Sequence, residues 1–317
     1  MSGLNIGLIG YRNHSIQIIN HLLKSKKIYK ITCYCYKKNK IHQLSTYYKN
    51  LKINFTNNLQ DLLKSDAYFI TSPSDTHVKY IKYFISENKP IFCEKTGLTN
   101  LKEYNFLNNL KKSKKQKIFF NYNFLYTELF KNLKKLYVQD KKDKLIHFNI
   151  YVTYGIAYLN KFKNNWRFNS KSILERISGN LGSHYLHFLI NLLGNPNYYS
   201  LIEKKISTKN KIDTAIFNLN FKNNITGNLI FSYASPMMNE MTFLFSKKII
   251  KIINNKLINY GPRNTFDSKG FFKTPKIKKI FYLNNLMYEL SYQESVNFFL
   301  KHVINKKQFK IKLFNDS

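Results

Sequence analysis

The sequence contains little cysteine. Its three cysteines, Cys33, Cys35 and Cys93, all fall in predicted strands, and their spacing is not that of metal ligands. This usage is typical of reduced thiols that serve as small core residues. The sequence therefore predicts neither a disulfide framework nor a metal site.

Long apolar runs are also missing. No segment approaches the roughly 18 consecutive apolar residues of a membrane-spanning helix. The first residues do not show a charged segment that leads into an apolar one, as a secretory signal would. We therefore expect a cytoplasmic protein without a membrane span. At 317 residues the chain is long enough for two domains of about 150 residues each.

Acidic side chains are scarce, because 17 Asp and Glu stand against 52 Lys and Arg, a formal net charge of +35. Such an excess would attract nucleic-acid phosphates. The lysines, however, occur in short runs scattered along the chain, and Asn, Ile, Tyr and Phe are abundant too, which indicates a compositional bias of the source genome. We expect weak, nonspecific attraction to polyanions and no specific nucleic-acid partner.

The pattern of apolar residues changes near residue 145. Before it, apolar strands alternate with amphipathic helices, which is typical of a doubly wound parallel sheet. The strands are expected near residues 4–9, 30–36, 67–71, 90–93 and 117–121. After it, short alternating runs are separated by Asn, Gly and Lys and interrupted by helices near 184–193 and 288–304. This second part predicts an open, largely antiparallel sheet.

The fold class is therefore α/β, with a Rossmann-like N-terminal domain and a C-terminal α+β domain. We place the first, a dinucleotide-binding domain, at residues 1–121. The second, at residues 122–317, would bind substrate and support oligomerisation.

Glycine is missing where a nucleotide-binding loop needs it most. A strand that ends at Ile9 and a helix from about residue 15 form a first βα unit, but the three positions of G-x-G-x-x-G hold Gly10, Arg12 and Ser15. The second glycine normally lets the backbone approach a pyrophosphate, so Arg12 either replaces that contact with its guanidinium or blocks it. The loop by itself leaves dinucleotide binding and a plain tight turn as alternatives.

The segment from Asp66 to Thr96 carries the strongest chemical signal. It predicts a strand, a tight turn at Ser72–Asp75, a helix, and a second strand that ends in Glu94 and Lys95. Since the carboxyl ends of parallel strands face the ligand crevice, Lys95 lies where chemistry would occur. The alternative is a solvated lysine beside Glu94.

Five segments occur in the order and spacing of a known family. Thr71–His77 is similar to its P-x-x-x-H loop, Glu94-Lys95-Thr96 to its E-K-P, and Trp166-Arg167 to its W-R. Gly179–His184 is similar to its D-x-x-x-H helix start, and Tyr292–Phe299 to its closing helix. Over nearly its whole length the chain resembles the Gfo/Idh/MocA family of nicotinamide-dependent sugar oxidoreductases.

The resemblance implies three catalytic residues. His184 would be the base that takes a hydroxyl proton, and Lys95 would stabilise the developing alkoxide. Asn180 stands where many members have aspartate; an amide cannot act as a base but can orient a hydroxyl. Its N-x-G-x-H context resembles the subgroup that oxidises nucleotide-linked amino-sugar acids for surface-polysaccharide synthesis. His184 could instead be a satisfied histidine at a helix start, and His187 is best interpreted as a helix-face histidine.

The resemblance also implies a cofactor, NADP or NAD. Tyr36 replaces the usual ribose-binding acid and Lys37 follows it, a change that favours NADP. The expected cofactor-binding residues are Gly10, Arg12, Asn13, Tyr36, Lys37, Ser72, Pro73, His77 and Glu94. The expected substrate-binding residues are Asn123, Trp166 and Arg167. Thr96 replaces a proline that follows a cis bond in the family, so this bond is either trans or held cis by packing.

The implied partners are a sugar or nucleotide-sugar substrate and further copies of the chain, as a homodimer or homotetramer. Three hypotheses follow. The first is a hydride-transferring sugar oxidoreductase. The second is a catalytically degenerate family member that only binds dinucleotide or sugar, favoured by Arg12, Ser15, Thr96 and Asn180. The third is a basic nucleic-acid binder.

Overall fold

A computed structural model describes residues 3–12, 14–140, 142–160, 176–208 and 211–315. The chain forms two compact units: Met1–Asn123 together with Glu289–Ser317, and Phe124–Tyr288. The first boundary lies two residues beyond the expected one, but the closing segment joins the first unit and not the second. Its aromatic side chains explain this, because the Phe299 ring packs 5.1 Å from Phe69 and 5.5 Å from Phe92, between centroids.

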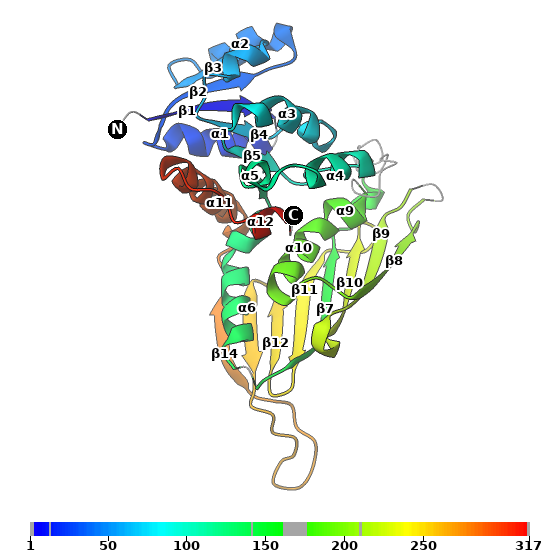
Figure 1. Ribbon diagram of the computed structural model, residues 1–317. Helices are drawn as coiled ribbons and strands as arrows, with labels where there is room; N and C mark the ends of the chain where they lie inside the picture. The colour runs from blue at the N-terminus through cyan, green and yellow to red at the C-terminus, as the bar shows by residue number, and fades with distance from the viewer. Residues whose placement is uncertain (1–2, 13, 141, 161–175, 209–210, 316–317) are drawn as a thin grey trace. The chain divides into compact units, whose positions relative to one another are not determined.

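The first unit contains a six-stranded parallel sheet in the order β3-β2-β1-β4-β5-β6 (Figure 1). Its strands are β1 Leu4–Ile9, β2 Ile28–Tyr34, β3 Ile53–Thr56, β4 Ala67–Ile70, β5 Ile91–Glu94 and β6 Ile118–Asn121. Every residue of β4, β5 and β6 is buried, as expected for strands covered on both faces. The parallel doubly wound sheet is confirmed. The edge strand β3 was not predicted, because only its first residue is buried.

Helices of the first unit connect these strands. They are α1 His14–Lys24, α2 Ile41–Tyr47, α3 His77–Phe84, α4 Leu101–Asn108 and α5 Lys112–Lys115, with α11 Met287–Ile304 and α12 Ile311–Asn315 at the end of the chain. Single-turn 3-10 helices are η1 Lys38–Lys40, η2 Leu59–Leu62, η3 Ser74–Thr76 and η4 Ile85–Glu87. Among the described residues, none of the helices has the length and apolar character needed to cross a membrane.

The second unit is built on an eight-stranded sheet in the order β14-β13-β12-β11-β7-β10-β9-β8. Only β10 and β7 pair in parallel; the other neighbours are antiparallel, which confirms the predicted sheet. The strands are β7 Leu145–Thr153, β8 Tyr198–Lys204, β9 Thr214–Asn220, β10 Thr226–Ser232, β11 Met238–Phe245, β12 Ile249–Ile253, β13 Lys256–Tyr260 and β14 Ile277–Tyr282.

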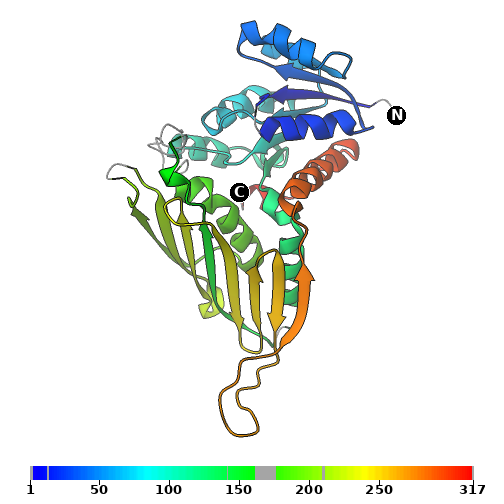
Figure 2. The same ribbon diagram turned by 180° about the vertical axis from the view of Figure 1, so that it is seen from behind.

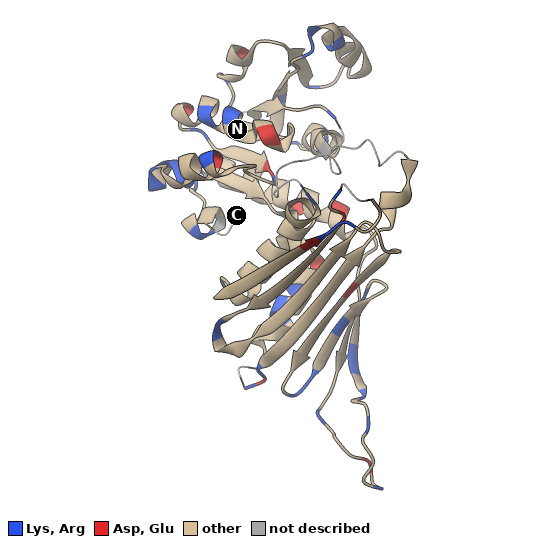
Figure 3. Cartoon of the chain, turned by 90° about the vertical axis from the view of Figure 1, so that its right-hand side faces the viewer, with Lys and Arg blue, Asp and Glu red and all other residues tan. Residues whose placement is uncertain are grey.

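Helices α6 Glu128–Val138 and α10 Gly182–Leu193 cover one face of this sheet, and the short α9 Ile177–Asn180 precedes α10 (Figures 1 and 2). Turns η5 Asn123–Tyr126, η6 Ile156–Tyr158 and η7 Lys222–Asn224 complete the unit. The core beneath the helices includes Phe148, Phe231 and Tyr185. Lys and Arg residues occur on helices, strands and loops of both units (Figure 3).

Candidate active site

The candidate cofactor residues follow the carboxyl ends of neighbouring parallel strands in the first unit. Gly10 follows β1, Tyr36 lies two residues beyond β2, and Thr71 follows β4. Lys95 follows β5 in the same way. Because all these strands run parallel, the segments lie at one edge of the sheet.

Gly10 adopts a backbone that only glycine tolerates well. Its φ is +113°, and a Cβ added to it would lie 2.7 Å from the carbonyl carbon and oxygen of Thr71. The end of β1 therefore approaches the end of β4 closely enough to exclude any side chain. This is the one position of the glycine motif that the sequence retains.

Ser15 occupies the position of the third glycine of the motif. It is 1 % exposed, and its Oγ donates a 3.0 Å hydrogen bond to the Thr71 carbonyl. Thr71 in turn donates from its N–H and its Oγ1 to the Ile9 carbonyl, at 2.8 and 2.9 Å. The serine thus ties α1 to the strand ends by hydrogen bonding, where the family motif uses close packing of a glycine.

Arg12 lies exposed just before α1. Its guanidinium carbon is 5.4 Å from the centroid of the Tyr11 ring, and Nη2 lies 3.5 Å from the Tyr11 hydroxyl. A guanidinium and the N-terminus of an 11-residue helix both favour an anion. The arrangement suits a contact to a pyrophosphate. The neighbouring candidate Asn13 lies outside the described residues.

The end of β2 adjoins the same loop, because the Cys33 thiol lies 3.7 Å from the Gly10 carbonyl oxygen. Tyr36 is 63 % exposed, and the Lys37 ammonium lies 5.8 Å from its ring centroid. Where the family resemblance implies a ribose-binding acid, the chain has Tyr36, with Lys37 next to it. A 2′-phosphate would meet attraction and no repulsion at this position.

The turn after β4 is held from inside by His77. Ring atom Nε2 lies 2.8 Å from the Ser72 carbonyl oxygen, and Nδ1 lies 2.8 Å from the Thr96 carbonyl oxygen. Thr76 Oγ1 donates to Ser72 Oγ at 2.7 Å and to the Pro73 carbonyl at 2.7 Å. Of the two alternatives for the bond between Lys95 and Thr96, the cis form is present.

Glu94 is a buried acid at the end of β5. Asn121, its register partner on β6, donates from Nδ2 to Glu94 Oε1 at 2.8 Å, and the Lys95 backbone N–H is also bonded to this carboxyl group. Burial raises the pKa of Glu94 to about 7, and Asn121 and Lys95 oppose that shift. The half-buried Lys95 thus follows a carboxyl group that changes charge near neutral pH.

Helix α11 contributes residues that sequence reasoning did not assign to a site. Ser291 is fully buried, and its Oγ accepts a 2.7 Å hydrogen bond from Asn123 Nδ2. Burial raises the pKa of Tyr292, and the charge of Glu94 adds to that rise. The candidate substrate residue Asn123 therefore has its amide nitrogen bonded to α11. No sequence signal identifies these contacts, since about 170 residues separate the partners.

The candidate base His184 lies on the first turn of α10 in the second unit. Its half-buried ring stacks on Phe124, with the centroids 4.3 Å apart and the planes inclined by 16°. Asn180 lies four residues earlier, and its N–H donates to the Arg176 carbonyl at 2.7 Å. Asn180 is the last residue of α9, and His184 is the third residue of α10.

Gly182 meets the sheet and not a ligand. A Cβ at this position would lie 3.3 Å from the Phe231 ring and 3.4 Å from the Phe217 ring. The glycine therefore lets α10 approach β10 and β9.

Two further contacts fix this helix start. Arg176 pairs with Glu203 of β8 at 3.0 Å, and Ser178 Oγ donates to the same carboxylate at 2.7 Å. His187 is 6 % exposed on the next turn, and burial lowers its pKa to about 3. It is a buried, neutral helix side chain at physiological pH.

The candidate substrate-binding residues Trp166 and Arg167 lie outside the described residues.

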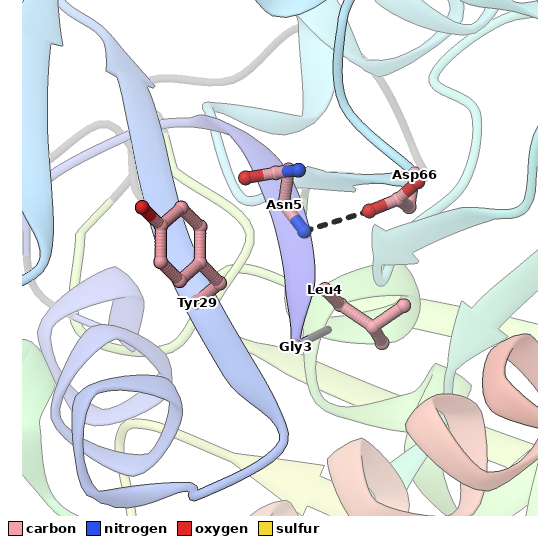
Figure 4. A pocket seen from close by; sticks show the side chains of 5 residues that line it. All are labelled: Gly3, Leu4, Asn5, Tyr29 and Asp66. Atoms are coloured by element: carbon pink, nitrogen blue, oxygen red, sulfur yellow. Dashed lines mark hydrogen bonds between the residues drawn. The ribbon is translucent and has the colours of Figure 1, made fainter. Parts of the chain in front are cut away.

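A cavity lies away from these groups, at the amino ends of β1 and β2. Figure 4 shows its lining residues, which are Gly3, Leu4, Asn5, Tyr29 and Asp66. The Asn5 backbone N–H donates to Asp66 Oδ2 at 2.8 Å across it. Because it occupies the edge opposite to Gly10 and Lys95, it is not part of the candidate active site.

Comparison with known proteins agrees with this geometry. Residues 4–122 match the model of the Gfo/Idh/MocA family, described as an oxidoreductase family with an NAD-binding Rossmann fold. No curated protein sequence matches the chain. Over residues 4–122 the chain therefore matches this oxidoreductase family, which confirms the resemblance inferred from the sequence for that part of the chain.

Solved structures share the fold over the whole chain. Myo-inositol 2-dehydrogenase from Lactobacillus plantarum is 16 % identical, with 99 % of this chain and 93 % of that chain covered and a TM-score of 0.75. A 3-ketoreductase from Actinomadura kijaniata, in complex with NADP and TDP-benzene, is 12 % identical, with 99 % and 94 % covered and a TM-score of 0.78. An oxidoreductase from Agrobacterium radiobacter, in complex with NAD+, L-tartaric acid and magnesium, is 12 % identical, with 99 % and 94 % covered and a TM-score of 0.75.

Proposed function

We propose that the protein is an NAD(P)-dependent oxidoreductase that transfers a hydride between the nicotinamide and a hydroxyl or keto carbon of a sugar or nucleotide-sugar. The observation that carries the proposal is Lys95, which directly follows the buried, hydrogen-bonded Glu94 at the carboxyl edge of a sheet from an NAD-binding family. An ammonium at that edge is suited to a substrate oxygen.

Lys95 would hydrogen-bond the reacting hydroxyl and stabilise its oxygen as negative charge develops. The contacts around Glu94 support this role, because they fix the backbone from which the lysine extends. The charge of Glu94 also matters. An ionised Glu94 carboxylate attracts the Lys95 ammonium, and this attraction is present above the pKa of Glu94, which is about 7.

His184 would take the hydroxyl proton in oxidation and return it in reduction. Imidazole is suited to both directions near neutral pH. Stacking on Phe124 supports a fixed ring plane, which a proton acceptor needs. Asn180, at the end of α9, would orient the hydroxyl through its amide, since an amide takes no proton.

The cofactor would lie along Gly10, Arg12, Tyr36 and Lys37 and continue past Ser72 and Pro73. The residues fit the group. Gly10 lets the loop after β1 lie close to Thr71, where a Cβ would collide, and Arg12 supplies positive charge just before α1. The nicotinamide, when bound, accepts or donates the hydride. We propose NADP over NAD because Tyr36 replaces the acid that would repel a 2′-phosphate, and Lys37 beside it supplies positive charge.

A nucleotide-linked sugar is the substrate class we propose first, with a place in surface-polysaccharide or glycan biosynthesis. The N-x-G-x-H sequence from Asn180 to His184 supports this class by resemblance. The Actinomadura kijaniata 3-ketoreductase, solved with NADP and a TDP derivative, is similar in fold. We further propose a cytoplasmic homodimer or homotetramer that associates through the sheet face opposite to α6 and α10.

A catalytically degenerate dinucleotide- or sugar-binding protein is the second candidate. The observation that favours it is Asn180, because the amide removes an acid that many members have. The two candidates differ in turnover.

Alanine variants of Lys95 and His184 separate these candidates. Nucleotide sugars and polyols are screened as substrates with each cofactor, by absorbance of the reduced nicotinamide. We expect each variant to lower kcat about 10²- to 10⁴-fold and to leave the cofactor affinity of H184A unchanged. Lys269, an exposed lysine on a loop, provides the control K269A, which should keep full activity. Turnover that survives in the K95A/H184A double variant would contradict the assigned roles.

A further inference from the structure

His77 is buried between two segments of the candidate active site. It is the first residue of α3 and is 1 % exposed. Its two ring nitrogens lie 2.8 Å from two different carbonyl oxygens, those of Ser72 and Thr96. The first belongs to the turn after β4, and the second belongs to the residue that follows Lys95. One imidazole ring thus bridges two strand ends.

The chemistry of this bridge is one-sided, because a carbonyl oxygen only accepts a hydrogen bond. A neutral imidazole has one N–H and a protonated imidazole has two, so the protonated ring alone donates to both carbonyls. Burial lowers the pKa of His77, whereas the two carbonyls and the carboxylates of Asp75 and Glu103 oppose that shift. Glu103 is held by the Thr99 N–H and Oγ1, at 2.6 and 3.0 Å.

The buried ring has no surface left for a ligand. Both ring nitrogens face carbonyl oxygens, and only 1 % of the residue's surface is exposed. Any effect of His77 on the cofactor or on substrate must therefore pass through the Ser72 turn or the Lys95–Thr96 peptide. This refines its predicted cofactor-binding role from direct contact to positioning.

We propose that His77 is a positioning residue that holds the Ser72 turn against the Lys95–Thr96 peptide and so determines where the Lys95 ammonium meets substrate. The inference rests on the proposed function. Two other contacts cooperate with the bridge. Thr76 Oγ1 closes the turn onto Ser72, and Gly97 packs against Phe120, whose ring would lie 2.4 Å from a Cβ.

The test compares His77→Ala with Val78→Ala. Val78 is the next residue of α3 and is also 1 % exposed, but it packs among apolar side chains of the core. Both variants lose buried contacts, and only H77A loses the bridge. We expect H77A to lower kcat about 100-fold, because small displacements of a catalytic group have effects of that size, and V78A to change kcat less than threefold.

A double-variant cycle identifies the route of the effect. If His77 acts through Lys95, H77A adds little to the loss already caused by K95A, so the two effects are not additive. Independent effects on kcat that multiply in H77A/K95A would overturn the assignment. Equal losses of kcat in H77A and V78A would also overturn it.

Amide hydrogen exchange provides a readout that does not depend on turnover. We expect residues 71–74 and 95–98 to exchange at least tenfold faster in H77A and to be unchanged in V78A. If wild-type protein binds no cofactor and shows no turnover, the proposed function fails while this difference still supports the bridge. Unchanged exchange in H77A overturns the bridge whether or not the enzyme is active.

Discussion

Lys95 follows the buried end of a parallel strand, whereas His184 lies on the first turn of a helix that packs across a largely antiparallel sheet. In the first region the backbone itself is fixed, by a glycine that admits no side chain, by a buried acid and by a histidine whose ring nitrogens lie 2.8 Å from two carbonyl oxygens. In the second region the positions are fixed by side-chain contacts, namely the stacking of His184 on Phe124 and the ion pair of Arg176 with Glu203.

Because they are fixed differently, the two regions should respond to substitution in different ways. Damage to the first should displace main chain and with it several ligand contacts. Damage to the second should reorient single side chains. The stability of the two regions should also depend on pH with opposite sign. Burial raises the pKa of Glu94 in the first region and lowers the pKa of His187 in the second.

The largest effect is expected for Gly10→Ala. Its Cβ would lie 2.7 Å from the Thr71 carbonyl group at a φ of +113°, so the variant combines a collision with backbone strain. We expect a loss of about 4 kcal/mol in the free energy of unfolding, measured by urea denaturation. Gly194, in the second unit, has a φ of +88° and nothing within 4 Å of an added Cβ. The control G194A should therefore lose only about 1 kcal/mol, and equal losses would contradict the close approach of β1 and β4.

His187 should make the second unit sensitive to acid. Its pKa is about 3 in the folded chain and 6.5 ordinarily. Between these values the unfolded chain binds a proton that the folded chain does not, so stability falls as pH drops from 6.5 towards 3. Between pH 7 and pH 4 the loss should be about 3 kcal/mol. His187→Gln should remove this slope, as measured by hydrogen exchange of the α10 amides; an unchanged slope would show that another group is responsible.

Glu94 should act in the opposite direction in the first unit. Its pKa is about 7 in the folded chain and 4.5 ordinarily, so the folded chain retains a proton that the unfolded chain has released. Its contribution is complete below pH 4.5 and is lost as pH rises through 7. Glu94→Gln should stabilise the β5 and β6 amides by about 3 kcal/mol at pH 8 and have little effect at pH 4.5. A gain that is equal at both pH values would exclude titration of Glu94 as its cause.

The smallest effect is expected for the pair of Arg176 and Glu203. Their side chains are 29 % and 14 % exposed, so solvent screens the pair in part. Arg176→Met should cost about 1 kcal/mol and weaken substrate binding through Asn180. Lys247, whose pair with Asp140 is about half exposed on both sides, supplies the control. If K247M costs as much as R176M, the pair does not fix the start of α9.

Much of the fold could be predicted from the sequence because strand and helix periods are local. The parallel sheet before residue 145 and the antiparallel sheet after it both follow from such local patterns. The return of residues 289–317 to the first unit does not, since Phe299 meets Phe69 only after the chain has folded. The edge strand β3 was missed because a half-exposed strand of four residues carries little apolar signal.

The candidate site divides along the same line. Gly10, Lys95 and His184 could be singled out because motif spacing marks them. The sequence did not reveal the role of Ser15, because its hydrogen bond to the Thr71 carbonyl joins residues that are far apart in the chain. Ser291, Arg176 and Glu203 gave no sequence signal, because their roles depend on partners far along the chain.

Cofactor titration tests the central claim most directly. Purified protein is titrated separately with NAD+, NADH, NADP+ and NADPH, by calorimetry and by fluorescence quenching. The account predicts micromolar binding, tighter for the 2′-phosphorylated forms, and selective loss of that preference in the Lys37→Glu variant. Failure of all four forms to bind at millimolar concentration would contradict the claim that the Gly10, Arg12 and Ser15 loop receives a dinucleotide.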